Sequence, residues 1–177
     1  MLESGNAFAS VSAGLVAGAG LSESIPAPHF LFGFRCYGPD GALRWAEDAH
    51  NIVTTGGKNS LLDNYFAGSV YTAAFKLGLK GAGTAVVGDT LASHAGWAEA
   101  NPYAGNRPAL VWSAASGASK AATALTYTIT GTATVAGAFV TDQATGTAGL
   151  LYSAGDFAPS RSVLAGDSLV VSLAVSV

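Results

Sequence analysis

Few side chains in this chain of 177 residues are placed for acid–base or metal chemistry. No two of the histidines His29, His50 and His94 stand four residues apart, the spacing with which one helix face holds a metal. His50 follows Glu47 and Asp48, which could form an acid–imidazole pair, but no partner nucleophile accompanies them. We therefore expect a solvated or capping role for these residues, and a structural hydrogen bond from the ring of His94.

The stretch Gly166-Asp167-Ser168-Leu169 resembles the motif of a hydrolase family in which the serine is the nucleophile. In those enzymes the motif comes early in the chain, and an Asp-x-x-His element follows near the C-terminus. Here only eight residues follow Leu169, and none of them is Asp or His. We expect a turn that leads into a strand, since Asp side chains cap backbone amides there. A serine hydrolase at Ser168 is the least supported function.

The remaining patterns also predict no catalytic residue, no metal site and no cofactor. Cys36, the only cysteine, lies in an apolar stretch and is interpreted as a buried, inert thiol. A carbohydrate-binding module for host adsorption is an alternative of another class, because aromatic side chains could line a sugar-binding face. Their spread along the chain favours core and interface roles instead for Trp45, Trp97, Trp112, Tyr103 and Tyr127.

Charged residues make up only 11% of the chain, whereas an ordinary soluble domain has about 25%. A compact monomer of this size exposes roughly 8,000 Å², so Ala, Gly, Ser and Thr must form most of the exterior. Such a surface suits a protein that packs against copies of itself or against a scaffold, and we expect a homo-oligomer, a dimer or a trimer. An extracellular β domain rich in Ser, Thr and Gly has a similar composition.

Net charge and hydropathy exclude two classes of partner. The formal charge of −3 provides no basic surface for nucleic acid. No run of eighteen apolar residues without Gly, Ser or charge is present, so we expect no membrane span. The N-terminus has no basic region and carries Glu3 early, unlike a secretory signal, and a single cysteine is compatible with synthesis in a reducing host cytoplasm.

Residues 29–177 have the pattern of one all-β domain, an antiparallel β-sandwich or jelly roll with one short helix. Phe30, Phe32 and Phe34 alternate with smaller or polar residues, and Gly38-Pro39-Asp40-Gly41 predicts a turn. Leucine and aromatic spacing predicts the helix over Lys58–Phe66. Further strands are expected at Ala42–Trp45, at Val70–Leu79, and at Ala109–Trp112, Leu125–Ile129, Thr132–Val140, Leu150–Phe157 and Leu169–Val177.

Residues 1–28 are rich in glycine and alanine, and Pro26 and Pro28 end the segment. Neither a helical nor a strand period holds across it. It is therefore either a flexible leader or an extended arm that orders along a neighbouring subunit. As an arm it would be anchored on that neighbour by its larger apolar side chains, Phe8, Leu15, Val16 and Leu21.

From Asn51 to Val177 the chain resembles a family of small structural proteins of tailed bacteriophages. The matching elements are Asn51–Asp63, Gly88–Glu99 with its Ala-Ser-His-Ala-Gly-Trp stretch, Arg107–Trp112, Gly137–Val140 and Gly166–Val171. The resemblance implies a virion component, with the head exterior as the preferred location. The function expected is that of a non-enzymatic capsid decoration (cement) protein whose partner is the major capsid protein. A tail, neck or baseplate subunit is the alternative.

Overall fold

The computed structural model describes residues 28–66 and 75–177, which form an antiparallel all-β fold with one short helix. This confirms the fold class expected from the sequence. In chain order the described elements are β1 (His29–Tyr37), β2 (Leu43–Val53), α1 (Thr55–Phe66), β3 (Lys76–Gly83), β4 (Trp97–Ala100), β5 (Ser119–Thr128), β6 (Ala133–Thr141), β7 (Leu151–Val163) and β8 (Ser168–Ser176).

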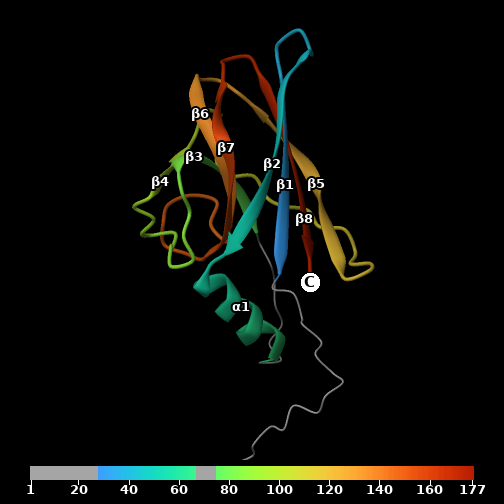
Figure 1. Cartoon of the computed structure of the whole chain (residues 1–177), viewed down its shortest axis with the longest axis vertical. Helices are drawn as coiled ribbons and strands as arrows, with labels where there is room; N and C mark the ends of the chain where they lie inside the picture. Colours follow the sequence, from blue (N-terminus) through green and yellow to red (C-terminus); the bar gives the residue numbers. More distant parts are fainter. Residues whose placement is uncertain (1–27, 67–74) are drawn as a thin grey trace, which may run out of the picture.

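The eight strands form one sheet in the order β4-β3-β6-β7-β2-β1-β8-β5, and the sheet curls until its two halves face each other (Figure 1). Phe34 of β1 meets Phe157 of β7 across the interior, with ring centroids 4.9 Å apart. The hydroxyl of Tyr127 on β5 donates to the carbonyl of Leu77 on β3 at 2.8 Å. These contacts join strands from the two halves, so one curled sheet supplies both layers of a sandwich.

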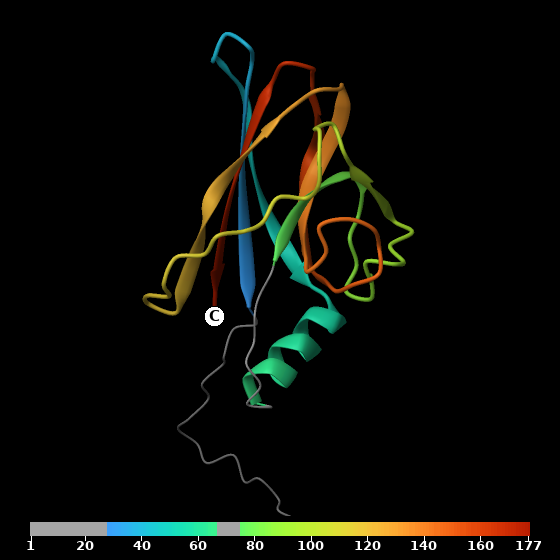
Figure 2. The same ribbon diagram turned by 180° about the vertical axis from the view of Figure 1, so that it is seen from behind.

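Residues 108–113 connect the two halves along the open side of the sheet (Figure 2). The amide of Leu77 donates to the carbonyl of Pro108, and the amide of Thr123 on β5 donates to the carbonyl of Val111. The strand expected at Ala109–Trp112 is therefore only a bridging segment with isolated pairings. Its amides and carbonyls are divided between two strands, so no continuous ladder forms.

The core follows the alternation that the sequence predicts for β1. Phe30, Phe32 and Phe34 are all buried, whereas the intervening Leu31 is 46% exposed. β8 continues the inner rows, since Phe32 is paired with the buried Leu173. An antiparallel sheet with one face inward requires this two-residue period.

β6 departs from that pattern because both of its faces are covered. Ala138 and Val140 point into the main core, and Phe139 between them points into a second apolar cluster. This cluster contains Leu91, from the segment before β4, and Trp97, the first residue of β4. The segment 84–97 thus covers the outside of the sheet, and the residues of β6 from Val135 to Thr141 are all buried rather than alternately exposed.

The helix begins three residues earlier than predicted, directly after Thr54. The Oγ1 atom of Thr54 accepts a hydrogen bond from the amide of Gly57 at 3.0 Å and donates to the carbonyl of Leu151. Thr54 is therefore the N-cap of α1, and it also ties the helix to β7. The two leucines of the predicted apolar helix face are not buried, since Leu61 is 41% and Leu62 is 54% exposed. α1 lies beyond the end of the sheet where β1 begins and β8 ends (Figure 1).

Candidate functional site

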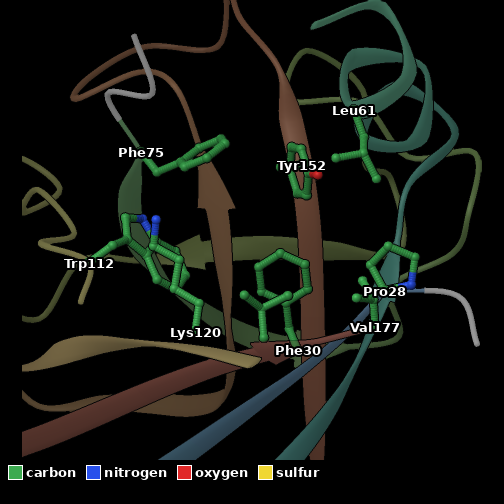
Figure 3. A pocket seen from close by; sticks show the side chains of 9 residues that line it. Pro28, Phe30, Leu61, Phe75, Trp112, Lys120, Tyr152 and Val177 are labelled. Atoms are coloured by element: carbon green, nitrogen blue, oxygen red, sulfur yellow. The ribbon is translucent and has the colours of Figure 1, made fainter. Parts of the chain in front are cut away.

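An apolar groove of about 440 Å³ lies at the end of the sheet that carries α1. It occupies the open end of the sandwich core, as Figure 3 shows for its side chains. The lining residues are Pro28, Phe30, Leu61, Phe75, Trp112, Lys120, Tyr152, Val175 and Val177.

The floor of the groove is the last inward-facing row of the sheet. Phe30 on β1 is paired with Val175 on β8, which is paired in turn with Lys120 on β5. From the opposite half, Tyr152 on β7 places its ring 5.6 Å from that of Phe30 and 5.1 Å from that of Phe75, edge-on in both cases. Curling of the sheet has therefore gathered these rings, and the site is aromatic at its base.

The rim of the groove comes from segments that only the fold brings together. Trp112 belongs to the bridging segment 108–113, and Leu61 belongs to α1. Val177, the last residue, is 56% exposed. Among the described lining residues, Lys120 is the one whose side chain carries a charge at neutral pH. The chemistry available is burial of apolar side chains with one cation at the edge, which suits a peptide segment better than a charged substrate.

The serine motif is a turn, as the sequence predicts. Ser168 begins β8 and is paired in register with Tyr37 and Thr128. The carboxylate of Asp167 is fully buried, where it accepts a hydrogen bond from the amide of Leu164 at 2.9 Å and pairs with Arg44 at 3.2 Å. Asp167 thus holds the turn and the neighbouring hairpin together. Its contacts are structural rather than catalytic.

Cys36 is buried beside this turn, as predicted. Its Sγ atom lies 3.6 Å from Oδ2 of Asp167. Burial, followed by the charge of Asp167, raises the pKa of the Cys36 thiol to about 11. A thiol with that pKa stays protonated near neutral pH, which makes it a poor nucleophile.

The structure does not assemble the acid–imidazole pair considered from the sequence. Glu47 forms an ion pair with Arg161, and Nε of Arg161 lies 2.7 Å from its carboxylate. Asp48 pairs with Arg35 at 3.5 Å on the surface. His50 is exposed near the far end of β2, with Asp156 as its register partner on β7. Both acids therefore serve other contacts.

His94 has the structural role expected of it. Its ring stacks on the indole of Trp97 with centroids 4.0 Å apart, and its Nδ1 lies 3.0 Å from the carbonyl of Trp97. The indole N–H of Trp97 donates to Asp89 at 2.9 Å, and the same carboxylate accepts the amide of Val86. The Ala-Ser-His-Ala-Gly-Trp stretch therefore builds the cover over the second apolar cluster.

Arg107, the first residue of the Arg107–Trp112 element named above, also has a structural role. Its guanidinium makes two hydrogen bonds of 2.7 Å to Glu99, and these bonds raise the pKa of Arg107. The same group donates to the carbonyls of Gln143 and Gly146 and lies over the ring of Phe139. Arg107 thus joins β4 to residues 139–146, which are distant in the sequence.

The aromatic residues considered for sugar binding do not share one face. Trp97 and Tyr127 are buried in different clusters, and Tyr103 packs edge-on against Tyr127. Of the three tryptophans, Trp112 alone lines the groove. Within residues 28–66 and 75–177 no group of three or more metal-ligating side chains is found.

The predicted arm anchors Phe8, Leu15, Val16 and Leu21 lie outside the described residues. The groove itself was missed by sequence reasoning. The one sequence signal for the groove was the phenylalanine alternation, which begins at Phe30, two residues after Pro28. No local sequence motif indicates that Trp112, Leu61 and Val177 belong to one site.

In comparisons with known proteins, no family model matches the chain, and no curated protein matches it significantly. In the part of the chain that the structure describes, no helix is both long and apolar enough to cross a membrane.

Proposed function

We propose that the protein is a non-enzymatic structural component of a phage virion, a decoration protein that binds the outside of an assembled capsid and staples neighbouring capsid subunits. The phage context comes from the sequence resemblance. The observation that carries the proposal is the gathering of exposed apolar side chains at the α1 end of the domain. The major capsid protein is the partner proposed.

That end of the domain is apolar well beyond the groove. Large apolar side chains more than a third exposed cluster around α1, the end of β2 and the C-terminus: Ile52, Leu61, Leu62, Val86, Val87 and Val177. The amide of Thr55, the first residue of α1, donates to the carbonyl of Val87, which places that segment beside the helix. Burial of such an apolar surface against another protein is favourable, because it removes the surface from water.

Much of the charge, by contrast, is already paired within the domain. Among the described residues, ion pairs join Arg35 to Asp48, Arg44 to Asp167, Lys80 to Asp156, Arg107 to Glu99 and Arg161 to Glu47. Attachment by weak apolar contacts, repeated by capsid symmetry, fits this distribution. Many such contacts acting together resist detachment through avidity rather than through one tight site.

The proposal is tested by adding purified protein to particles of the phage that carries the gene, prepared without this protein. We expect Leu62→Asp to lower particle occupancy at least about tenfold, since it charges the apolar end. Leu43→Asp is the matched control, because Leu43 is also 54% exposed but lies in the β1–β2 hairpin at the other end (Figure 1). No binding of the unaltered protein to these particles would refute the proposal.

Copy number in native virions separates shell from tail. On the order of hundreds of copies per particle supports capsid decoration, since closed shells repeat each site by symmetry. About a dozen copies or fewer would instead assign the protein to the tail, neck or baseplate. Quantitative mass spectrometry of purified virions provides the count.

A further inference from the structure

The groove lies at the point where the N-terminal segment joins the domain. Pro28 is both the first described residue and part of the lining, and β1 starts at His29. The 27 residues that precede Pro28 therefore begin their path at the rim of an apolar site. Figure 3 shows Pro28 beside Val177 at this rim.

The composition of that segment complements the groove. Between Ser10 and Leu21 the chain is made of small residues together with Val11, Leu15, Val16 and Leu21. Small residues allow close backbone approach, and the four larger side chains are apolar, like the lining. The segment has acidic but no basic side chains, and Lys120 is the one cation of the groove.

Two prolines favour a route away from the parent domain. The residue before a proline is disfavoured in helical conformation and prefers an extended one. Ile25 and Ala27 precede Pro26 and Pro28, so the sequence favours an extended connection into β1. An extended connection of this kind has no turn that would reverse the chain into the groove beside it. Exchange of an identical segment between copies is a low-cost route to an oligomer.

We propose that the groove is the docking site for residues 15–21 of a second copy of this chain. Leu15, Val16 and Leu21 insert against Trp112, Leu61 and Val177 of the neighbour. The exchanged segment holds the copies together as a homo-oligomer. This exchange takes place in the free protein and does not depend on a capsid, so its failure is distinct from failure of the proposed function.

The test is complementation between two full-length variants, measured by sedimentation velocity and light scattering. The groove variant is Leu61→Asp/Val177→Asp, which charges two exposed rim positions. The segment variant is Leu15→Asp/Val16→Asp/Leu21→Asp. We expect the unaltered protein to be oligomeric and each variant alone to be monomeric. Mixed, they should double the mass, since one supplies an intact segment and the other an intact groove.

Three results would overturn the proposal. The first is a monomeric unaltered protein, and the second is a variant that remains fully oligomeric. The third is a mixture that stays monomeric, which is the result expected if the segment docks within its own chain or if another segment fills the groove. Leu43→Asp is the control and should oligomerise like the unaltered protein. Circular dichroism verifies folding of each variant. If the groove variant is unfolded, Lys120→Glu serves in its place, because it changes the charge at a half-buried position of the same lining.

Discussion

Lys80 and Asp156 form an ion pair across Gly137, the residue that lies between them on the intervening strand β6. Nζ of Lys80 is 2.6 Å from Oδ1 of Asp156. Lys80 is paired in register with Gly137, and Gly137 is paired with Asp156. Because glycine has no side chain, the lysine of β3 reaches the aspartate of β7 directly. The side chain of Lys80 is fully buried, with its ammonium 5.4 Å from the ring of Trp97.

We predict that Asp156→Asn lowers the free energy of unfolding by about 3 kcal/mol, because removal of one partner leaves a buried charge unpaired. The value is at the lower end of the usual range since the Asp156 side chain is 29% exposed. Urea denaturation measures the change. The control is Asp48→Asn, which breaks the exposed pair with Arg35 and should cost less than about 1 kcal/mol. Equal losses for the two variants would contradict the predicted difference.

Gly78 should tolerate no side chain. A Cβ at Gly78 would lie 2.2 Å from the ring of Phe139, its register partner on β6. The buried ring must then shift, so we expect Gly78→Ala to destabilise the fold by about 1–3 kcal/mol. Gly88→Ala is the control, since a Cβ there meets nothing within 4 Å and should change stability by less than about 0.5 kcal/mol. Thermal and urea unfolding report both values.

Stability should fall at alkaline pH. Burial raises the pKa of Cys36 to about 11 and that of Tyr103 to about 12, in each case above the ordinary value. The unfolded chain therefore loses these protons first, and stability that is complete below about pH 9 declines as the pH rises toward 12. Urea midpoints measured from pH 8 to pH 12 test the decline.

Two variants separate the contributions to that decline. Cys36→Ser removes the thiol but keeps a donor for Asp167, so the fall between pH 9 and 11 should become shallower. Tyr103→Phe should make the curve shallower only above about pH 10, where the tyrosine of the unfolded chain begins to ionise. Part of the decline remains in that variant, because burial also raises the pKa of Tyr127. An unchanged pH profile in both variants would refute this assignment.

The N-cap of α1 also makes a measurable contribution. Thr54→Ala removes the acceptor for the amide of Gly57 and the donor to the carbonyl of Leu151. Loss of an N-cap costs about 0.5–2 kcal/mol, and we expect the upper half of that range because Thr54 is buried. Thr55→Ala, one residue later and exposed, should cost less. Comparable losses for both would show that capping is not the cause.

The sequence alone determined the local elements. The phenylalanine alternation predicted β1, since a strand with one buried face repeats every two residues. The helix was found from its leucine spacing, yet Leu61 and Leu62 are exposed. Spacing of this kind specifies a conformation, whereas burial depends on what packs against it. The strand at Ala109–Trp112 was wrong for the same reason, because its amides and carbonyls are shared between two strands of a curled sheet.

Tertiary structure decided what the sequence leaves open. Lys80 looks like a surface residue until curling of the sheet and the covering segment 84–97 bury it beside Asp156. The groove likewise has no sequence motif, since Trp112, Leu61 and Val177 belong to segments that are far apart in the chain. Periodic local preferences can be read from neighbouring residues. A site made of distant residues depends on strand order and sheet curvature, which those preferences do not encode.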